Sequence, residues 1–198
     1  MAARTETAPR APVKLPRRTS AWARLSRNGL AVAGLLIVVV IIAIALAAPI
    51  LPLADPNITE PANRLLSPFS EGAVLGTDQL GRDMLSRLVW GARVSIAVGV
   101  AATLVAALIG STIGLVAAYF GRITDNVLMR GVDMLMAFPY LLLALAIVAA
   151  LGPGLMNALL AIAVVNIPFF ARSVRGATLG LVNREFIDAA RLSGFSDR

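Results

Sequence analysis

The sequence contains no cysteine and no histidine, and Lys14 is its only lysine. Without cysteine there is no disulfide framework and no thiolate chemistry. Without histidine, most zinc sites, imidazole proton relays and Ser-His or Cys-His catalysis are excluded. Lys14 is not preceded by glycine, so the chain lacks the Gly-Lys-Ser/Thr sequence of a phosphate-binding loop. We therefore expect no catalytic residues, no metal site, no cofactor and no ATP hydrolysis by that route.

Charge is also scarce, because charged residues make up only 15% of the chain and hydrophobic residues 58%. A soluble domain is about a quarter charged. Residues 28–54, 94–120 and 134–171 carry no charge at all. This segregation is typical of membrane spans and predicts an all-α membrane protein in contact with lipid. The net charge of +7 does not indicate a nucleic-acid partner, because the positive residues lie where membrane topology places them.

The N-terminal residues 1–28 form a basic, proline-containing tail, which we interpret as flexible and cytoplasmic. The first transmembrane helix is expected within residues 29–51, which are long enough to cross a bilayer. Ala45-Leu46-Ala47 also looks like a signal-peptidase site. The apolar part of a signal peptide is usually only about 7–15 residues, so we favour an uncleaved anchor.

Residues 52–93 are interpreted as an external loop that begins irregularly because it is rich in proline. Its second half, residues 77–93, repeats apolar side chains at spacings near one helical turn. This pattern predicts an amphipathic helix on the membrane surface.

Residues 94–171 are expected to form a core of three further helices, which span residues 94–120, 134–151 and 155–171. Pro139 breaks the third span early. The second span contains Gly110 and Gly114, a pattern of small residues that permits close helix approach. Between these spans we expect a short polar loop after residue 121 and a tight turn at residues 152–154.

Two asparagines, Asn157 and Asn166, are polar positions inside the fourth span. Hydrogen bonding between helices is the preferred interpretation of both, with contact to a substrate as the alternative. Proline within the spans suggests either a packed bundle around an aqueous path or simple kinks.

Lysine and arginine predict the orientation of the chain. Seven lie in the tail, two follow the second span and five lie in residues 172–198, against four in the loop of residues 52–93. Four spans with a cytoplasmic N-terminus put the larger group inside.

A signature lies ahead of the second span and consists of Gly76, Thr77, Asp78, Gly81, Arg82, Asp83, Ser86 and Arg87. It closely resembles the signature of permeases in the dipeptide, oligopeptide and nickel ABC importers. It resembles the permease type with an extended N-terminal region. The resemblance implies a multi-pass permease subunit in the bacterial inner membrane.

The C-terminal segment, residues 172–198, contains a second resemblance, to the EAA loop of ABC importer permeases. Asp188 stands in place of the family's glutamate, and Gly194 keeps the family's spacing. Independently of the family, the charges and the final glycine favour a short helix with Asn183 as its cap. The residues expected to couple to an ATPase are Glu185, Asp188, Ala189, Ala190 and Gly194.

The resemblance implies the type I ABC importer permease fold and import of peptides or related small solutes, with dipeptide, oligopeptide and nickel systems left open. It also implies four partners: a second permease subunit, two ATPase subunits and an extracytoplasmic solute-binding protein. Compared with the family's usual six transmembrane helices, we expect only four in this sequence, with an incomplete EAA-type loop. A C-terminally truncated, non-transporting fragment or an assembly or regulatory protein is therefore the alternative interpretation.

Overall fold

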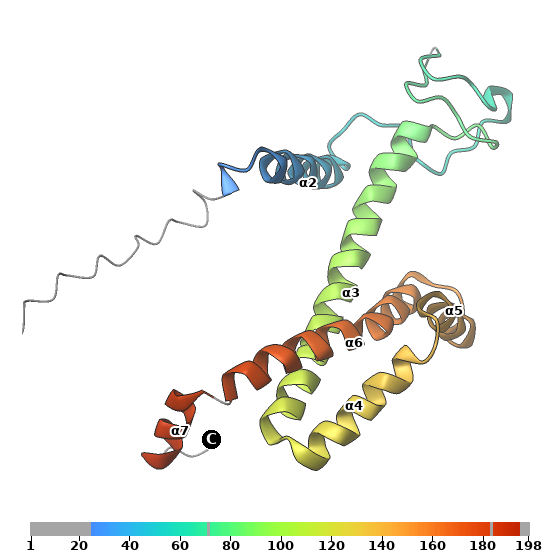
Figure 1. Cartoon of the computed structure of the whole chain (residues 1–198). Coiled ribbons are helices and arrows are strands. Elements are labelled where there is room, and N and C mark those ends of the chain that lie inside the picture. The colour runs from blue at the N-terminus through green and yellow to red at the C-terminus, as the bar shows by residue number, and fades with distance from the viewer. Residues whose placement is uncertain (1–24, 71, 183, 195–198) are drawn as a thin grey trace, which may run out of the picture. The chain divides into compact units, whose positions relative to one another are not determined.

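The structure is a computed structural model that describes residues 25–70, 72–182 and 184–194 (Figure 1). The tail expected over residues 1–28 lies outside this description, except for residues 25–28. Helices dominate the described part and no strand occurs in it, so the expected all-α membrane class is confirmed. Its elements are α2 (Gly29–Ala47), a short 3-10 turn (Pro61–Asn63), α3 (Met84–Phe120), α4 (Arg122–Met136), α5 (Tyr140–Leu151), α6 (Leu155–Val182) and α7 (Glu185–Leu192).

The chain divides into two compact units, Met1–Ile44 and Ala45–Arg198. Most of α2 belongs to the first unit, and its 19 residues are apolar on every side. At a rise of about 1.5 Å per residue, α2 is ~28 Å long, close to the ~30 Å hydrocarbon core of a bilayer. The helix ends at Ala47 rather than at residue 51, since Pro49 and Pro52 cannot supply the backbone N–H groups that a longer helix needs.

The long helix α3 joins two segments that the sequence suggested were separate. No surface helix begins at residue 77; instead α3 begins at Met84 and continues without a break to Phe120, over 37 residues. The residues before Met84 form tight turns, because the Asp78 carboxylate accepts the backbone N–H groups of Leu80 and Arg82. Such local bonds compete with a helix.

The region of α4 and α5 corrects two expectations about residues 122–151. The charged residues 122–133 are helical and not a loop. The expected third span is a helix pair bent by 88°, and α5 keeps only 12 residues. Pro139 lies at the break, since proline disfavours helical geometry in the residue before it. At ~18 Å, α5 alone is too short to cross a bilayer.

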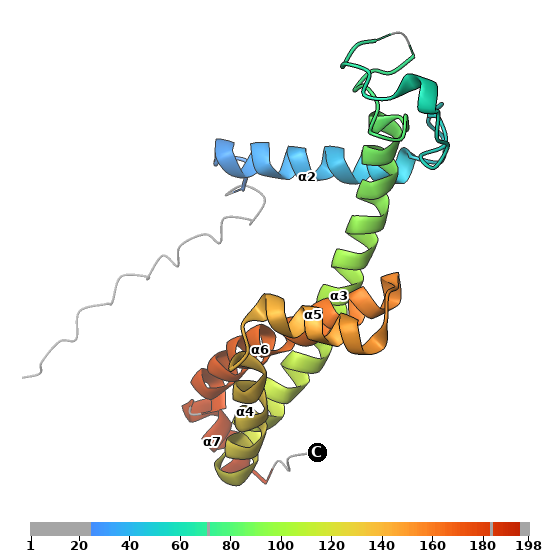
Figure 2. The same ribbon diagram turned by 90° about the vertical axis from the view of Figure 1, so that its right-hand side faces the viewer.

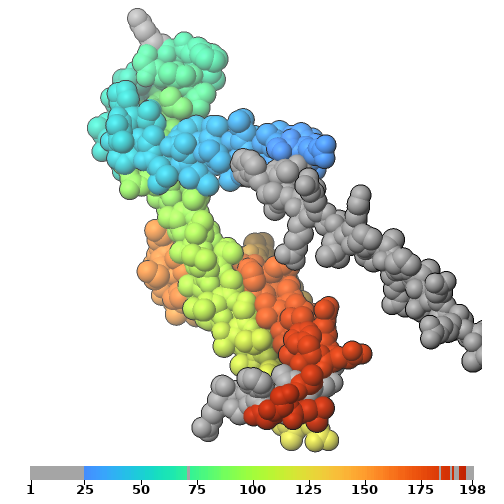
Figure 3. Space-filling view, turned by 90° about the vertical axis from the view of Figure 1, so that its left-hand side faces the viewer, coloured from blue at the N-terminus to red at the C-terminus, as the bar shows by residue number. Residues whose placement is uncertain are grey.

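The helix α6 extends to Val182, well beyond the expected end of the fourth span at residue 171. Figure 3 shows α6 lying against one half of α3. A Cβ atom built on Gly110 would meet the Ile167 carbonyl oxygen at 2.6 Å, and one on Gly114 would meet that of Ala171 at 2.3 Å. The close approach predicted for these glycines is therefore confirmed.

The same contacts give the relative direction of α3 and α6. Residue numbers rise together along the two helices, from Gly110 beside Ile167 to Gly114 beside Ala171. The helices are therefore parallel, and the chain between them has to return. The bent pair of α4 and α5 makes this return, so three helices and the bent pair provide up to four spans by length and composition (Figure 2).

Candidate functional site

Thr77 ties the signature to the segment that precedes it. Its hydroxyl donates to the Asn63 carbonyl and accepts the Leu66 N–H at 2.9 Å. The Thr77 N–H donates to the Leu66 carbonyl at 3.2 Å. One threonine thus satisfies backbone groups of a loop segment more than ten residues earlier in the chain.

Asp78 is the charged centre of this loop. Its carboxylate accepts the Leu80 N–H at 2.8 Å and the Arg82 N–H at 3.0 Å, and it pairs with the Arg82 guanidinium at 2.7 Å. Arg87 also donates to it, from the first turn of α3. Desolvation raises the pKa of the Asp78 carboxyl, but the hydrogen bonds from Arg82 and Leu80 outweigh it. The pKa falls from 3.8 to about 2.

The two signature glycines fill positions where a side chain has no room. Gly76 has φ +76°, and a Cβ there would lie 2.3 Å from the Leu66 carbonyl oxygen. Gly81 has φ +77°, and its Cβ would lie 1.9 Å from the Glu60 carbonyl oxygen. Both the backbone angle and the close approach require glycine at these positions.

The last residues of the signature form the N-terminal end of α3, with Asp83 as its cap. The Asp83 carboxylate accepts the Ser86 N–H at 2.8 Å, which is the geometry of a helix N-cap. Ser86 is fully buried, and its hydroxyl donates to the carbonyl of Ala54. This bond joins the beginning of the loop to the first turn of α3. We interpret the signature as the set of residues that folds the loop onto α3.

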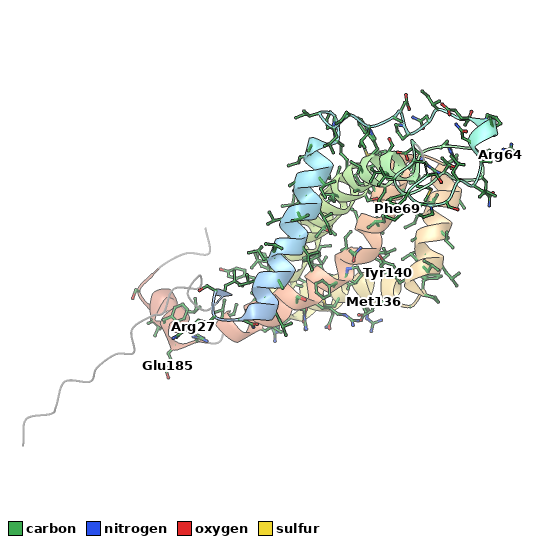
Figure 4. All side chains as sticks on the ribbon, turned by 90° about the horizontal axis from the view of Figure 1, so that it is seen from above. Arg27, Arg64, Phe69, Met136, Tyr140 and Glu185 are labelled. Carbon is green, nitrogen blue, oxygen red and sulfur yellow. The ribbon has the colours of Figure 1, made fainter. Side chains whose placement is uncertain are left out.

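The short helix α7 follows α6 and carries the candidate coupling residues (Figure 4). Glu185, Phe186 and Ala189 are exposed on it. The side chains of Asp188 and Ala190 lie outside the described part of the chain, as does the expected cap Asn183.

Gly194 follows the end of α7 with φ +83°, which is the left-handed geometry of a helix C-terminal stop. Ser193 closes the last turn, since its N–H and its hydroxyl both donate to the Ala189 carbonyl, at 3.0 and 2.8 Å. A Cβ on Gly194 would meet no atom within 4 Å. The backbone angle alone therefore accounts for glycine here.

A cavity of about 600 Å³ lies at the bend between α4 and α5, against α6. Figure 4 labels Met136 and Tyr140, which stand on either side of the bend. The lining is largely apolar, but it includes the polar groups of Tyr140, Asn166 and Arg172. A mostly apolar hollow with a few polar groups is the usual form of a small-molecule path or site.

The two asparagines differ in position. Asn157 closes the turn between α5 and α6, because its amide donates to the carbonyls of Leu151 and Gly152 at 2.9 and 3.0 Å. Asn166 faces the cavity, where its amide donates to the Ile162 carbonyl at 2.7 Å and lies 3.5 Å from the Tyr140 hydroxyl.

Two ion pairs between α4 and α6 were not found from the sequence. Arg175 donates to both carboxylate oxygens of Asp125, at 2.5 and 2.6 Å. Arg172 donates to Asp133 at 2.6 Å. The sequence signal was weak, since opposite charges 50 and 39 residues apart become partners only once the helices pack. Among the described residues, no group of three His, Cys, Asp or Glu side chains could hold a metal.

Comparison with known sequences gives two family matches. Residues 110–198 match the model described as "Binding-protein-dependent transport system inner membrane component". Residues 18–68 match "N-terminal TM domain of oligopeptide transport permease C".

Curated proteins extend the similarity across most of the chain. The dipeptide transport system permease protein DppC of Alkalihalophilus pseudofirmus is 46% identical over 177 residues, 89% of this chain and 58% of that protein. The glutathione transport system permease protein GsiD of Pectobacterium atrosepticum is 43% identical over 176 residues, 89% of this chain and 58% of that protein. The di/tripeptide transport system permease protein DppC of Pseudomonas aeruginosa is 41% identical over 179 residues, 87% of this chain and 59% of that protein. The chain therefore spans somewhat more than half the length of these relatives.

Proposed function

Because this chain belongs to the family of inner-membrane permease components of binding-protein-dependent transport systems, we propose that it serves ATP-driven import of peptides or related small solutes. The names of the relatives support this solute class, since they are described as dipeptide, di/tripeptide and glutathione transporters. The permease itself carries out no covalent chemistry. In this proposal a second permease subunit completes the path, two separate ATPase subunits hydrolyse ATP, and an extracytoplasmic solute-binding protein delivers the solute.

The orientation we propose has the N-terminus and α7 in the cytoplasm and the signature loop outside. The distribution of lysine and arginine supports it, because the loop of residues 52–93 holds four of the eighteen. In this orientation the parallel helices α3 and α6 both run from outside to inside, so that α7 follows α6 in the cytoplasm.

The observation that best supports the proposed coupling role is the separate, exposed helix α7, which follows α6. A short helix that ends at a left-handed glycine presents a compact surface to a partner. Closure of the ATPase subunits would push α7 and rock the membrane helices between inward and outward openings. Glu185, Asp188, Ala189, Ala190 and Gly194 are the proposed contact residues.

The cavity at the bend of α4 and α5 is the proposed portion of the solute path. Asn166 is the better placed of the two asparagines for solute contact, because Asn157 holds the turn between α5 and α6. In this proposal Tyr140 and Asn166 offer hydrogen bonds to a passing peptide, while the apolar lining tolerates different side chains.

The experiment that tests the function is ATP-dependent uptake of labelled di- and tripeptides by vesicles. These vesicles contain the importer assembled around this chain, with and without the solute-binding protein. Because the chain has no cysteine, Ser67→Cys and Ser193→Cys report topology by labelling with an impermeant thiol reagent. Uptake that requires ATP and the binding protein, with Ser67→Cys labelled from outside, is expected. Peptide uptake that is independent of this chain, or external labelling of Ser193→Cys, would contradict the proposal.

A further inference from the structure

The two Asp–Arg pairs between α4 and α6 are the polar contacts that join these helices in the described part of the chain. Asp125 and Arg175 form the stronger pair, because both carboxylate oxygens are engaged and the side chains are only 19% and 33% exposed. Asp133 and Arg172 are more exposed and joined by one contact. A water-exposed pair of this kind contributes little by itself.

The pairs hold α4 near both of its ends. Asp125 lies in its first turn and Asp133 in its last. Along α6 the order is reversed, since Arg175 faces Asp125 and Arg172 faces Asp133. The two helices therefore run in opposite directions, and α4 cannot slide along α6 without breaking both pairs.

Arg175 is also the point where three helices meet. Its guanidinium binds Asp125 of α4. Its backbone lies close to Gly114 of α3, since a Cβ built on Gly114 would stand 2.9 Å from the Arg175 backbone nitrogen. Gly121, at φ +59°, separates the end of α3 from the start of α4. The first turn of α4 is thus fixed covalently to α3 and ionically to α6.

The same pairs lie between α7 and the cavity. Arg175 precedes the start of α7 at Glu185 by about three helical turns. Arg172 lines the cavity, and its partner Asp133 lies near the end of α4 that leads into the bend. A displacement of α6 would therefore move Arg172 in the cavity wall, together with its partner Asp133 on α4.

We propose that Asp125–Arg175 and Asp133–Arg172 are positioning pairs that fix α4 to α6, so that movement of α7 shifts the α4–α5 bend and the wall of the cavity. The inference rests on the proposed transport function. Without the pairs, α6 would still move with α7, but the bend would follow it incompletely. Uptake per ATP hydrolysed would fall while the protein remained folded in the membrane.

Charge reversal and charge exchange test the pairs in the complete importer. Asp125→Arg and Arg175→Asp are each expected to lower peptide uptake per ATP by about 2- to 30-fold, the range of measured coupling effects. The double exchange should restore most of this loss. The equivalent changes at Asp133 and Arg172 should act in the same direction but more weakly. Arg130→Glu, on the exposed side of α4 and outside both pairs, is the matched control and should leave uptake unchanged.

A reversible tether separates a positioning role from simple stabilisation. Asp133→Cys with Arg172→Cys supplies the only two thiols of this chain, which a short, cleavable bifunctional reagent can link. Linked protein should keep its uptake per ATP, and cleavage of the linker should lower it. Uptake blocked by the link and restored by cleavage would show that the pair has to open, which would overturn the inference.

The remaining outcomes distinguish the inference from the proposed function. Normal uptake per ATP in both single reversals at Asp125 and Arg175 would overturn the inference and leave the function intact. Failure of the double exchange to recover any uptake, with normal membrane insertion, would have the same meaning. Absence of uptake by the unaltered importer would overturn the function, and the inference with it.

Discussion

Gly114 of α3 lies against Ala171 of α6 so closely that a Cβ on the glycine would stand 2.3 Å from the alanine carbonyl oxygen. In a bilayer, helices associate through such close packing because lipid is as apolar as their side chains. Together with the contact of Gly110 with Ile167, it shows that α3 and α6 are parallel. The chain between two parallel helices has to return, and α4 and α5 form that return.

Gly114→Ala should weaken this packing by about 1–3 kcal/mol, the usual range for overpacking a tight contact. Thermal unfolding of the detergent-solubilised protein measures the change. Gly99→Ala is the matched control, because it lies in the same helix and a Cβ there meets no atom within 4 Å. Equal stability of the two variants would contradict the close packing of α3 on α6.

Gly81→Ala should disrupt the signature loop, because its Cβ would lie 1.9 Å from the Glu60 carbonyl oxygen. Gly72→Ala is the control, since Gly72 has a similar φ of +82° but open space around it. Both variants carry the backbone strain, and only one carries the collision. Limited proteolysis from the outside should cut the Gly81→Ala loop faster than the Gly72→Ala loop. Equal rates would mean that the packing against Glu60 is unimportant.

The Asp78 carboxylate should make the loop sensitive to acid in a narrow window. Its pKa is lowered from 3.8 to about 2 in the folded loop, so ionised Asp78 favours the folded form. This contribution is complete above about pH 4 and is lost as the pH falls through about 2. Trp90 lines a hollow with Pro56 and Arg82, so its fluorescence should report the change in a Trp22→Phe background.

Asp78→Asn should remove the acid transition of Trp90, while Asp55→Asn, in the same loop, should keep it. The control matters because the loop contains other carboxyl groups, among them Asp55. A transition of unchanged midpoint in Asp78→Asn would show that a different group controls the loop.

Local patterns predicted much of the fold. The uncharged runs located the helices α2, α3 and α6, and the spacing of Gly110 and Gly114 predicted the close helix contact. Pro139 indicated that the third span is broken. It did not reveal the 88° bend or the helical state of residues 122–133.

The long-range contacts of the signature residues could not be predicted from the sequence. These residues were identified through the family resemblance, but two of them make contacts to residues much earlier in the chain. Thr77 reaches Asn63, and Ser86 reaches Ala54 across 32 positions. No local periodicity encodes such pairs. For the same reason Asp125 and Arg175 appeared in the sequence only as scattered charges, and they become partners only where α4 packs against α6.

Gly194 provides the most direct test of the central claim that the chain couples solute movement to a separate ATPase through α7. At φ +83°, valine is strained by about 1–2 kcal/mol, whereas asparagine tolerates this geometry. The decisive measurement is the ratio of peptide uptake to ATP hydrolysis in vesicles that contain equal amounts of membrane-inserted importer. We expect Gly194→Val to lower this ratio strongly and Gly194→Asn to keep it near that of the unaltered protein. An unchanged ratio in Gly194→Val would contradict the coupling role of α7.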